Sequence, residues 1–465
     1  MPRPERGRRI GVIGAGFSGV MTAIHLLWRC DRHDRVYLVE KSGRIGPGLA
    51  YGTQHAGHLV NVRAENMGAF ADEPEHFLRW LERLPPQERA QAGELTVAGL
   101  FVRRSFYADY VQSLLRDALM KQGGAQNLFL VADAATALKA TGDGLRLVTA
   151  GGRTFPLDAA VLALGNFAPE RASLPGYFRN PWDPAATEGL DRPDPILLVG
   201  GGLTMVDVVM TLLANEFTGP LVAISRRGLL PQSHAPSSPW SGLRLLTDDR
   251  RSLTALVRAV RREVARAAAQ GVGWRSVVDA LRPDLRQLWV QLDGADKARF
   301  LRHVRAYWDV HRHRLAPPVA AAFEAVRQSG QLRVLAGRLQ TIEREKDGLA
   351  VTWRPKGEAE PLRFVAQRVI ECTGPGTDYA ELDDPLVRQL VSDGLVRPDP
   401  LRLGLDSTPA GTLIDALGGS SRPLFGVGPV TRGTFWEITS VPDIRIQAEQ
   451  VAEHVLRTLA PTRAA

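Results

Sequence analysis

The sequence predicts an α/β fold made of two Rossmann-like domains with a helical insertion. Two observations carry the α/β part: a glycine-rich loop follows a short apolar run within residues 10–19, and a second such loop follows another apolar run within residues 196–205. The third observation is the stretch 253–330, where apolar residues recur at helical intervals between arginines and little strand pattern occurs.

The first loop has every part of a dinucleotide-binding β-α-β unit. Its apolar run predicts a buried strand that ends at Gly14, where the turn into a helix needs a conformation that a side chain would obstruct. Gly16 lets the backbone approach a pyrophosphate, and Gly19 lets the helix pack closely on the strand. The next predicted strand ends in Glu40, close to the expected position of a ribose-binding acid. A glycine-rich turn in another kind of parallel sheet would leave Glu40 unexplained.

The second loop departs from the pattern at one position. Gly200 and Gly202 occupy the first two glycine positions, whereas Met205 stands at the third. The strand predicted next is followed by Arg226 and Arg227, where an acid would indicate NAD. A guanidinium can form two hydrogen bonds to a ribose 2′-phosphate, which favours NADPH. The alternative is a solvated basic turn in a chain that is rich in arginine throughout.

Two loops predict two dinucleotides, because each needs its own pyrophosphate cradle. We therefore expect a flavoprotein that binds FAD at the first loop and takes hydride from NAD(P)H at the second. The expected domains are a first part of the FAD-binding domain, an NAD(P)-binding unit, the helical insertion, and the remainder of both domains with a closing flavin-side helix: residues 1–190, 191–235, 236–330 and 331–465. Such nesting would bring both cofactors to one cleft.

The remaining elements follow from local patterns along the chain. Residues 74–123 are expected to be mostly helical, and Pro442 is placed to open the closing helix because its fixed φ suits a first helical turn. Strands are expected at residues 10–13, 36–39, 128–131, 145–150, 159–164, 196–199, 221–224, 332–335, 349–353, 369–372 and 424–429.

Composition excludes several classes of protein. The net charge of +8 comes from arginines spread along the chain, whereas a nucleic-acid binder would concentrate them on one face. Cys30 and Cys372 are the only cysteines, so neither a redox-active C-x-x-C pair nor a zinc-binding cluster is expected, and no metal site is predicted. No apolar stretch is long enough for a membrane span, and the first glycine loop accounts for the apolar residues after the basic start, so we expect a cytoplasmic protein.

Several side chains are candidates for contacts with substrate or cofactor. In the run 308–314, His311, Arg312, His313 and Arg314 either contact substrate or nicotinamide phosphate, or form a solvated basic helix end. They cannot all face one pocket, because neighbours on a helix point about 100° apart. Further candidates near the flavin or nicotinamide rings are Tyr51, Asn61, Arg104, His234, Trp436 and Glu437. Core packing is the alternative for the aromatic residues, a surface ion pair for Arg104, and simple exposure for His234.

Five motifs resemble those of a family of FAD/NAD(P)-binding proteins that includes flavin-dependent urate hydroxylases and aspartate N-monooxygenases. They lie at residues 14–19, 48–52, 225–228, 308–314 and 437–445, so the resemblance covers nearly the whole chain. It implies that NAD(P)H reduces FAD, which reacts with O₂ and transfers one oxygen atom to a small polar substrate. The cofactor carries that chemistry, so the resemblance assigns no catalytic side chain.

The resemblance specifies cofactors better than substrate. Urate, and with it purine metabolism, is the first expectation, and aspartate is the second. The segment 178–183 keeps aromatic residues but lacks the histidine of the fingerprint found in Baeyer–Villiger relatives, so ketone oxygenation is not implied. A flavin oxidoreductase without oxygen insertion, or a redox sensor, remains the alternative. The oligomeric state is left open.

Overall fold

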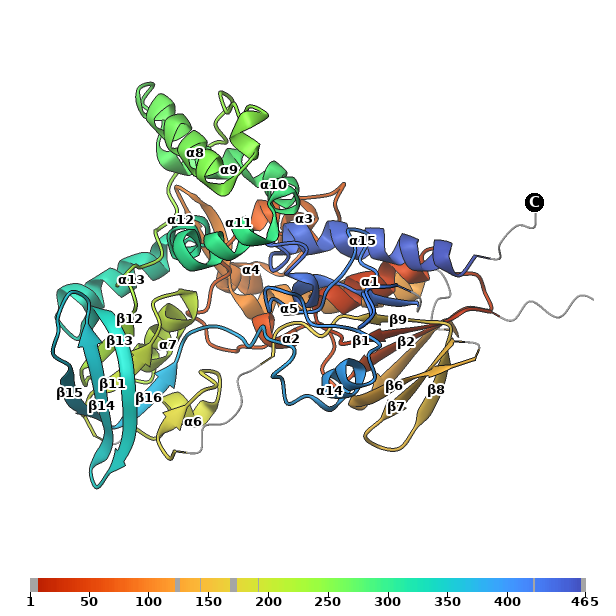
Figure 1. Cartoon of the computed structure of the whole chain (residues 1–465), viewed down its shortest axis with the longest axis horizontal. Helices are drawn as coiled ribbons and strands as arrows, with labels where there is room; N and C mark the ends of the chain where they lie inside the picture. Colours follow the sequence, from red (N-terminus) through yellow and green to blue (C-terminus); the bar gives the residue numbers. More distant parts are fainter. Residues whose placement is uncertain are drawn as a thin grey trace, which may run out of the picture.

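Two α/β domains lie side by side, and a block of helices stands above the junction between them (Figure 1). The molecule is represented by a computed structural model, which describes residues 7–121, 126–142, 144–167, 174–190, 192–420 and 423–460.

The first domain contains a five-stranded parallel sheet in the order β17-β9-β1-β2-β5. Its strands are rich in Val, Ile and Leu because both faces of a parallel sheet are covered. Their bounds are β1 (Arg9–Ile13), β2 (Arg35–Glu40), β5 (Leu128–Ala132), β9 (Ala159–Leu162) and β17 (Leu424–Gly426). In β1, Ile10 and Val12 belong to one hydrophobic core and Ile13 to a second one on the opposite face.

Helices cover the first face of this sheet and a small antiparallel sheet covers the other. The helices are α1 (Phe17–Leu27), α5 (Arg104–Lys121) and α15 (Val441–Thr458), which share the first core. The opposite face packs on α14 (Pro385–Ser392) and on the sheet of β6 (Ala135–Thr141), β7 (Gly144–Thr149) and β8 (Thr154–Leu157). α15 has Pro442 in its first turn, as the sequence predicted.

Residues 74–123 were expected to be mostly helical, and they also contain a hairpin. They include α3 (His76–Glu82), α4 (Pro86–Ala92), the hairpin of β3 (Gly93–Thr96) and β4 (Gly99–Val102), and α5; residues 122–123 lie outside the described ranges. Upstream, α2 (Gly48–Tyr51) follows β2. Short 3₁₀ turns occur at Ala64–Asn66, Asp248–Arg250, Arg282–Asp284 and Gly428–Thr431.

The second domain contains a seven-stranded sheet in the order β10-β16-β11-β12-β13-β14-β15. Its strands are β10 (Tyr177–Phe178), β11 (Ile196–Val199), β12 (Leu221–Ser225), β13 (Leu332–Glu345), β14 (Gly348–Pro355), β15 (Leu362–Ala366) and β16 (Arg368–Glu371). Helices α6 (Pro184–Thr187), α7 (Leu203–Ala214) and α13 (Pro317–Gln328) pack around it. β10 pairs with β16 in this sheet, although residues up to 190 were assigned to the FAD-binding part.

The helical block comprises five helices: α8 (Leu253–Ala268), α9 (Trp274–Ala280), α10 (Leu285–Gln291), α11 (Gly294–Arg299) and α12 (Arg305–Arg312). A π-helical turn, Phe300–Val304, joins the last two. Trp289 and Phe300 pack against Trp436 of the first domain, so the block is anchored on the segment between β17 and α15. No helix in the described ranges is long and apolar enough to cross a membrane.

Candidate cofactor sites and the cleft between the domains

A cleft of about 900 Å³ opens at the carboxyl ends of β1, β2 and β9. Its lining includes Gly14, Gly16 and Glu40 from the first domain, and Arg179 and Glu371 from the second. Ligands of open α/β sheets bind outside the carboxyl ends of the strands, so the cleft has the expected position for a dinucleotide.

The three glycines of the first loop serve different purposes. Gly14 has φ +101°, and a Cβ there would lie 2.3 Å from the carbonyl oxygen of Ala163. A Cβ on Gly19 would lie 1.8 Å from the carbonyl oxygen of Gly14. A Cβ on Gly16, by contrast, would meet nothing closer than the Cα of Gly48 at 3.5 Å. Gly14 and Gly19 are needed because the neighbouring backbone leaves no room for a side chain. At Gly16 the space is open, and a pyrophosphate can occupy it.

Glu40 is held beside the N-terminus of α1. Its Oε2 accepts a hydrogen bond from the backbone N–H of Ala15 at 2.9 Å, and its Oε1 accepts from the backbone N–H and hydroxyl of Ser42 at 2.9 and 2.8 Å. Within the described ranges, no side chain caps α1, whose N-cap is Gly16. A carboxylate next to an uncapped helix N-terminus can bind a ribose and a pyrophosphate together, so these residues fit the adenosine part of FAD.

The second loop repeats this geometry in the other domain. Gly200 has φ +129°, and a Cβ there would lie 2.6 Å from the carbonyl oxygen of Cys372. Gly202 is the N-cap of α7, and a Cβ on it would meet no described atom within 4 Å. Met205 is fully buried in the core of the domain, so the third glycine position is used for packing. The N-terminus of α7 is therefore available for a second pyrophosphate.

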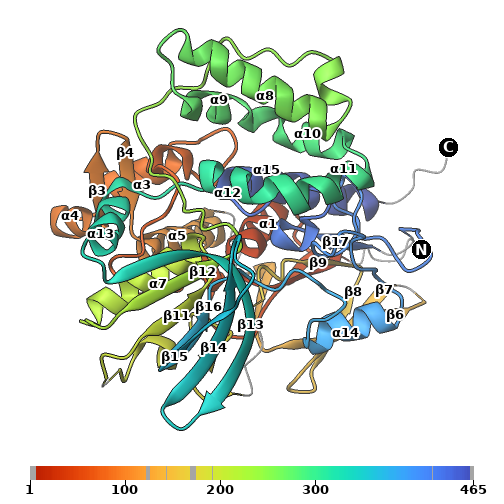
Figure 2. The same ribbon diagram turned by 60° about the vertical axis from the view of Figure 1, so that its left-hand side comes forward.

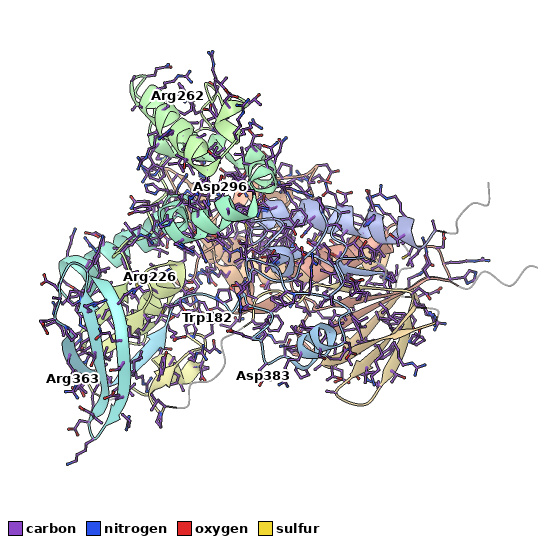
Figure 3. The ribbon with its side chains drawn as sticks, viewed as in Figure 1. Trp182, Arg226, Arg262, Asp296, Arg363 and Asp383 are labelled. Atoms are coloured by element: carbon purple, nitrogen blue, oxygen red, sulfur yellow. The ribbon has the colours of Figure 1, made fainter. Side chains whose placement is uncertain are left out.

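The two arginines after β12 have different surroundings. Arg226 is exposed at the second domain and has no hydrogen bond or ion pair to any other described residue (Figure 3). Arg227 donates a hydrogen bond to the carbonyl oxygen of Arg302 at 3.3 Å and lies over the ring of Tyr307, 5.4 Å from its centroid. Arg227 thus links the sheet to the helical block, whereas the guanidinium of Arg226 remains available to bind a phosphate.

Polar contacts join α7 to the first domain. Arg104 on α5 forms an ion pair with Asp207 on α7 at 2.8 Å, and their side chains are only 17% and 11% exposed. His58 Nε2 lies 3.0 Å from the hydroxyl of Thr211, also on α7. His58 also contacts the ring of Trp182, which Figure 3 places between the two domains. Arg104, a candidate to flank the flavin, is therefore part of a largely buried interdomain ion pair.

Three other candidates also have structural partners. His234 Nε2 lies 3.0 Å from the carbonyl oxygen of Asn61, which joins the second β-α-β unit to the first domain. Burial lowers the pKa of His234 to about 4, so its ring is neutral at pH 7. Tyr51 packs on Tyr107 with ring centroids 4.6 Å apart, as the core-packing alternative predicted.

The run 308–314 is not a solvated basic helix end. Arg314 is 2% exposed and forms an ion pair with Asp279 at 2.9 Å. Arg312 Nε lies 3.3 Å from Oε2 of Glu437, and both side chains are buried. Glu437 Oε1 accepts a hydrogen bond from the indole N–H of Trp308 at 2.8 Å. Folding α12 against the segment before α15 thus pairs charges for which local sequence patterns provide no partner.

The two cysteines lie in different domains. Cys30 follows α1, and burial raises the pKa of its thiol to about 12. Cys372 follows β16 and is buried, which also raises the pKa of its thiol. The two thiols are free, so neither belongs to a dithiol pair.

A family model and solved structures resemble this chain. Residues 11–167 match the family model described as FAD-NAD(P)-binding, a segment that contains the first glycine loop and Glu40. No curated protein sequence gives a significant match.

Three solved structures illustrate the structural similarity. Ornithine N-hydroxylase from Kutzneria sp. 744, solved with reduced FAD, NADP⁺ and L-ornithine, has a TM-score of 0.62 at 14% identity, over 97% of this chain and 99% of its own. L-lysine 6-monooxygenase from Pseudomonas syringae gives 0.61 at 14% identity with the same coverage. Thioredoxin reductase from Lactococcus lactis gives 0.50 at 12% identity, over 97% of this chain and 100% of its own. The chain thus has the two-domain fold of these flavoproteins, and its residues 11–167 match an FAD-NAD(P)-binding family model.

Proposed function

We propose that this protein is an FAD-dependent, NAD(P)H-consuming monooxygenase that hydroxylates a nitrogen atom of an amino acid or a closely related amine. The observation that carries the proposal is full-length similarity: the ornithine and lysine hydroxylases align over 97% of this chain and 99% of their own, with higher TM-scores than the thioredoxin reductase. None of these structures is a urate hydroxylase, so urate, the substrate first expected, has no support from them.

The cysteines argue against disulfide reduction, which the same fold can also support. A dithiol reductase needs two thiols close together, whereas Cys30 and Cys372 belong to separate domains and are both free. Bound FAD would supply hydride acceptance and reaction with O₂. The residues of the chain would then bind, orient and shield the reacting molecules.

Each part of the described geometry has a role in this proposal. The loop of Gly14 and Gly16 with Glu40 would hold the adenosine and pyrophosphate of FAD. The uncapped N-terminus of α7 would hold the pyrophosphate of the nicotinamide dinucleotide. The pair Arg104–Asp207 would keep the two sites in register for hydride transfer.

The proposal is tested with purified FAD-loaded protein in air. NADPH and NADH oxidation and oxygen uptake are recorded with ornithine, lysine, aspartate and urate in turn, and products are analysed by mass spectrometry. A faster rate with one amino acid and a product heavier by one oxygen on nitrogen is expected. Flavin reduction without a stimulating amine or hydroxylated product would instead favour an electron-transfer oxidoreductase or sensor.

We expect coenzyme preference to depend mainly on Arg226, which is exposed and has no hydrogen bond or ion pair to another described residue. Arg226→Ala is expected to raise KM for NADPH roughly 10- to 100-fold, the cost of a lost charged hydrogen bond, and to change KM for NADH much less. Arg227→Ala, which loses its contacts to Arg302 and Tyr307, serves as the matched comparison. Steady-state kinetics with both coenzymes measures the effect. Equal changes for NADPH and NADH would show that Arg226 does not contact the 2′-phosphate.

A further inference from the structure

Buried charge is concentrated where the helical block meets the segment between β17 and α15. Arg312 on α12 and Glu437 in the segment have side chains only 11% and 6% exposed. Arg432 lies in the same segment, with its guanidinium over the ring of Trp436, 4.5 Å from the centroid. Trp308 and Arg312 of α12 both contact Glu437, just before α15, so this cluster lies on the flavin-domain side of the helical block (Figure 2).

The segment that carries the cluster begins beside the first dinucleotide loop. Gly428, just after β17, approaches the first turn of α1 so closely that a Cβ on it would lie 2.4 Å from the hydroxyl oxygen of Ser18. Its backbone N–H donates to Oε1 of Gln447 on α15 at 2.7 Å. The chain then continues through Arg432 to Glu437, so the cluster and the FAD site share one connecting segment.

The two arginines have donors without acceptors. Nε and Nη2 of Arg312 are buried and form no hydrogen bond in the described structure, although Nε is 3.3 Å from Glu437 Oε2. Nε of Arg432 is likewise buried without an acceptor, and no described carboxylate lies within ion-pair distance of Arg432. Two buried acceptors of the same cluster, Asp309 Oδ1 and Glu437 Oε2, also form no hydrogen bond. Buried polar groups are nearly always paired in native proteins, so the cluster points to a bound group that has acceptors for the arginines and can also donate to the carboxylates, as an amino acid does.

The charges of the cluster do not balance. Four arginines face three carboxylates: Arg282, Arg305, Arg312 and Arg432 against Asp309, Glu437 and Asp443. Burial, reinforced by Arg305, lowers the pKa of Arg432 to about 10, which leaves it charged at pH 7 in an unfavourable environment. Burial also lowers the pKa of His313, which favours the neutral ring, so His313 does not add to the positive charge. An anion would relieve this excess.

We propose that Arg312 and Arg432 form a carboxylate-binding subsite that holds the acidic end of the substrate. Guanidinium groups suit this task because each can donate two parallel hydrogen bonds to a carboxylate, and Trp436 orients the plane of Arg432. The assignment to substrate rests on the proposed N-hydroxylation of an amino acid. The same N–H groups could also bind a phosphate of the nicotinamide dinucleotide, and the experiment distinguishes a substrate carboxylate from a coenzyme phosphate.

Arg432 is the informative position for mutation. Arg432→Gln removes a buried charge without leaving any carboxylate unpaired, so the ligand-free, FAD-loaded variant is expected to melt at or above the temperature of the original protein. Arg312→Gln would instead leave Glu437 without its cation. Arg262→Gln is the matched control, because Arg262 lies at the outer part of the helical block and Asp249 is its only ion-pair partner among the described residues (Figure 3).

The first experiment measures binding without turnover. Thermal melting of the FAD-loaded protein is followed with succinate, its uncharged analogue succinamide, inorganic phosphate and NADP⁺. Succinate is expected to raise the melting temperature, whereas succinamide has no effect, and Arg432→Gln is expected to weaken succinate binding roughly 10- to 100-fold. Arg262→Gln should bind succinate normally. The inference is overturned if succinate does not stabilise the protein, or if Arg432→Gln binds succinate as tightly as the original protein does. If Arg432→Gln loses NADP⁺ binding while succinate binding is unaffected, the site belongs to the coenzyme.

The second experiment links the subsite to the substrate. For the amino acid that stimulates NAD(P)H oxidation, Arg432→Gln should raise KM by the same factor by which it weakens succinate binding. It should leave the rate of flavin reduction by NAD(P)H unchanged. Arg432→Lys, which keeps the positive charge, should raise KM less. A fall in kcat with unchanged KM contradicts a carboxylate subsite. If no amine is hydroxylated while succinate still binds through Arg432, the proposed function fails and the anion site stands. If an amine is hydroxylated but succinate does not bind, the anion site fails and the proposed function stands.

Discussion

Gly16→Leu is expected to give a folded protein that no longer retains FAD. The space around Gly16 is open, since the nearest described atoms to a Cβ there are the Cα and N of Gly48, at 3.5 and 4.0 Å. A leucine side chain would occupy the place where the backbone must approach the pyrophosphate. We expect FAD affinity to fall at least about 100-fold, or ~2.7 kcal/mol. Flavin absorbance after gel filtration and titration of the apoprotein with FAD measure the loss.

Two glycine variants separate cofactor binding from folding. Gly294→Leu places the same side chain at the start of α11, where a Cβ would meet no described atom within 4 Å, and should retain FAD fully. Gly19→Ala should lower stability itself, because its Cβ would lie 1.8 Å from the carbonyl oxygen of Gly14. A yellow Gly16→Leu protein with one FAD per chain would contradict the assignment of the first loop.

Arg104→Met is expected to loosen the contact between the two domains while leaving FAD bound. The change removes the cation from a pair that is 17% and 11% exposed, and so leaves the carboxylate of Asp207 largely buried without its partner. We expect a loss of about 3 kcal/mol in the free energy of unfolding. Because α7 would no longer be held in register, flavin reduction by NADPH should slow at least about 10-fold. Urea denaturation and stopped-flow flavin absorbance test the two effects.

The double variant Arg104→Met with Asp207→Leu is the control for this interpretation. Replacing both partners of a buried ion pair by apolar side chains is often close to neutral for stability, so the double variant should recover much of the loss. Flavin reduction should remain slow, because the directional contact between α5 and α7 is still missing. A double variant that is no more stable than Arg104→Met would mean that the unpaired carboxylate is not the cause.

Local sequence patterns predicted the fold class, because they reflect what the backbone conformation and the packing of neighbouring residues require. A glycine after a buried strand, as at Gly14 and Gly200, is needed wherever the backbone has positive φ and lies against a neighbouring strand. Spacing alone predicted helices within residues 253–330, and α8 to α12 form the helical block there, whereas α13 in the same stretch packs on the sheet of the second domain. The hairpin of β3 and β4 was missed in a stretch that otherwise has a helical pattern, since a short hairpin leaves little periodicity to detect.

Substrate and coenzyme contacts were harder to predict, since they depend on which segments meet. Arg226 and Arg227 are equivalent in the sequence pattern, yet only Arg227 is engaged by the helical block. No sequence motif marks Arg432 as a binding residue, because it is one arginine among many. Its side chain is buried only because the segment after β17 packs against α12.

The sequence by itself determined that this chain forms two dinucleotide-binding α/β domains, because glycine spacing, apolar runs and a terminal acid such as Glu40 are short-range features that must hold in any fold containing them. Only the tertiary structure decided which charges are paired, as in Arg104–Asp207 and Arg312–Glu437, and which donors are left free, as in Arg432. The physical reason is that the energy of a charge is set by its burial and its partners, and both come from segments far apart in the chain.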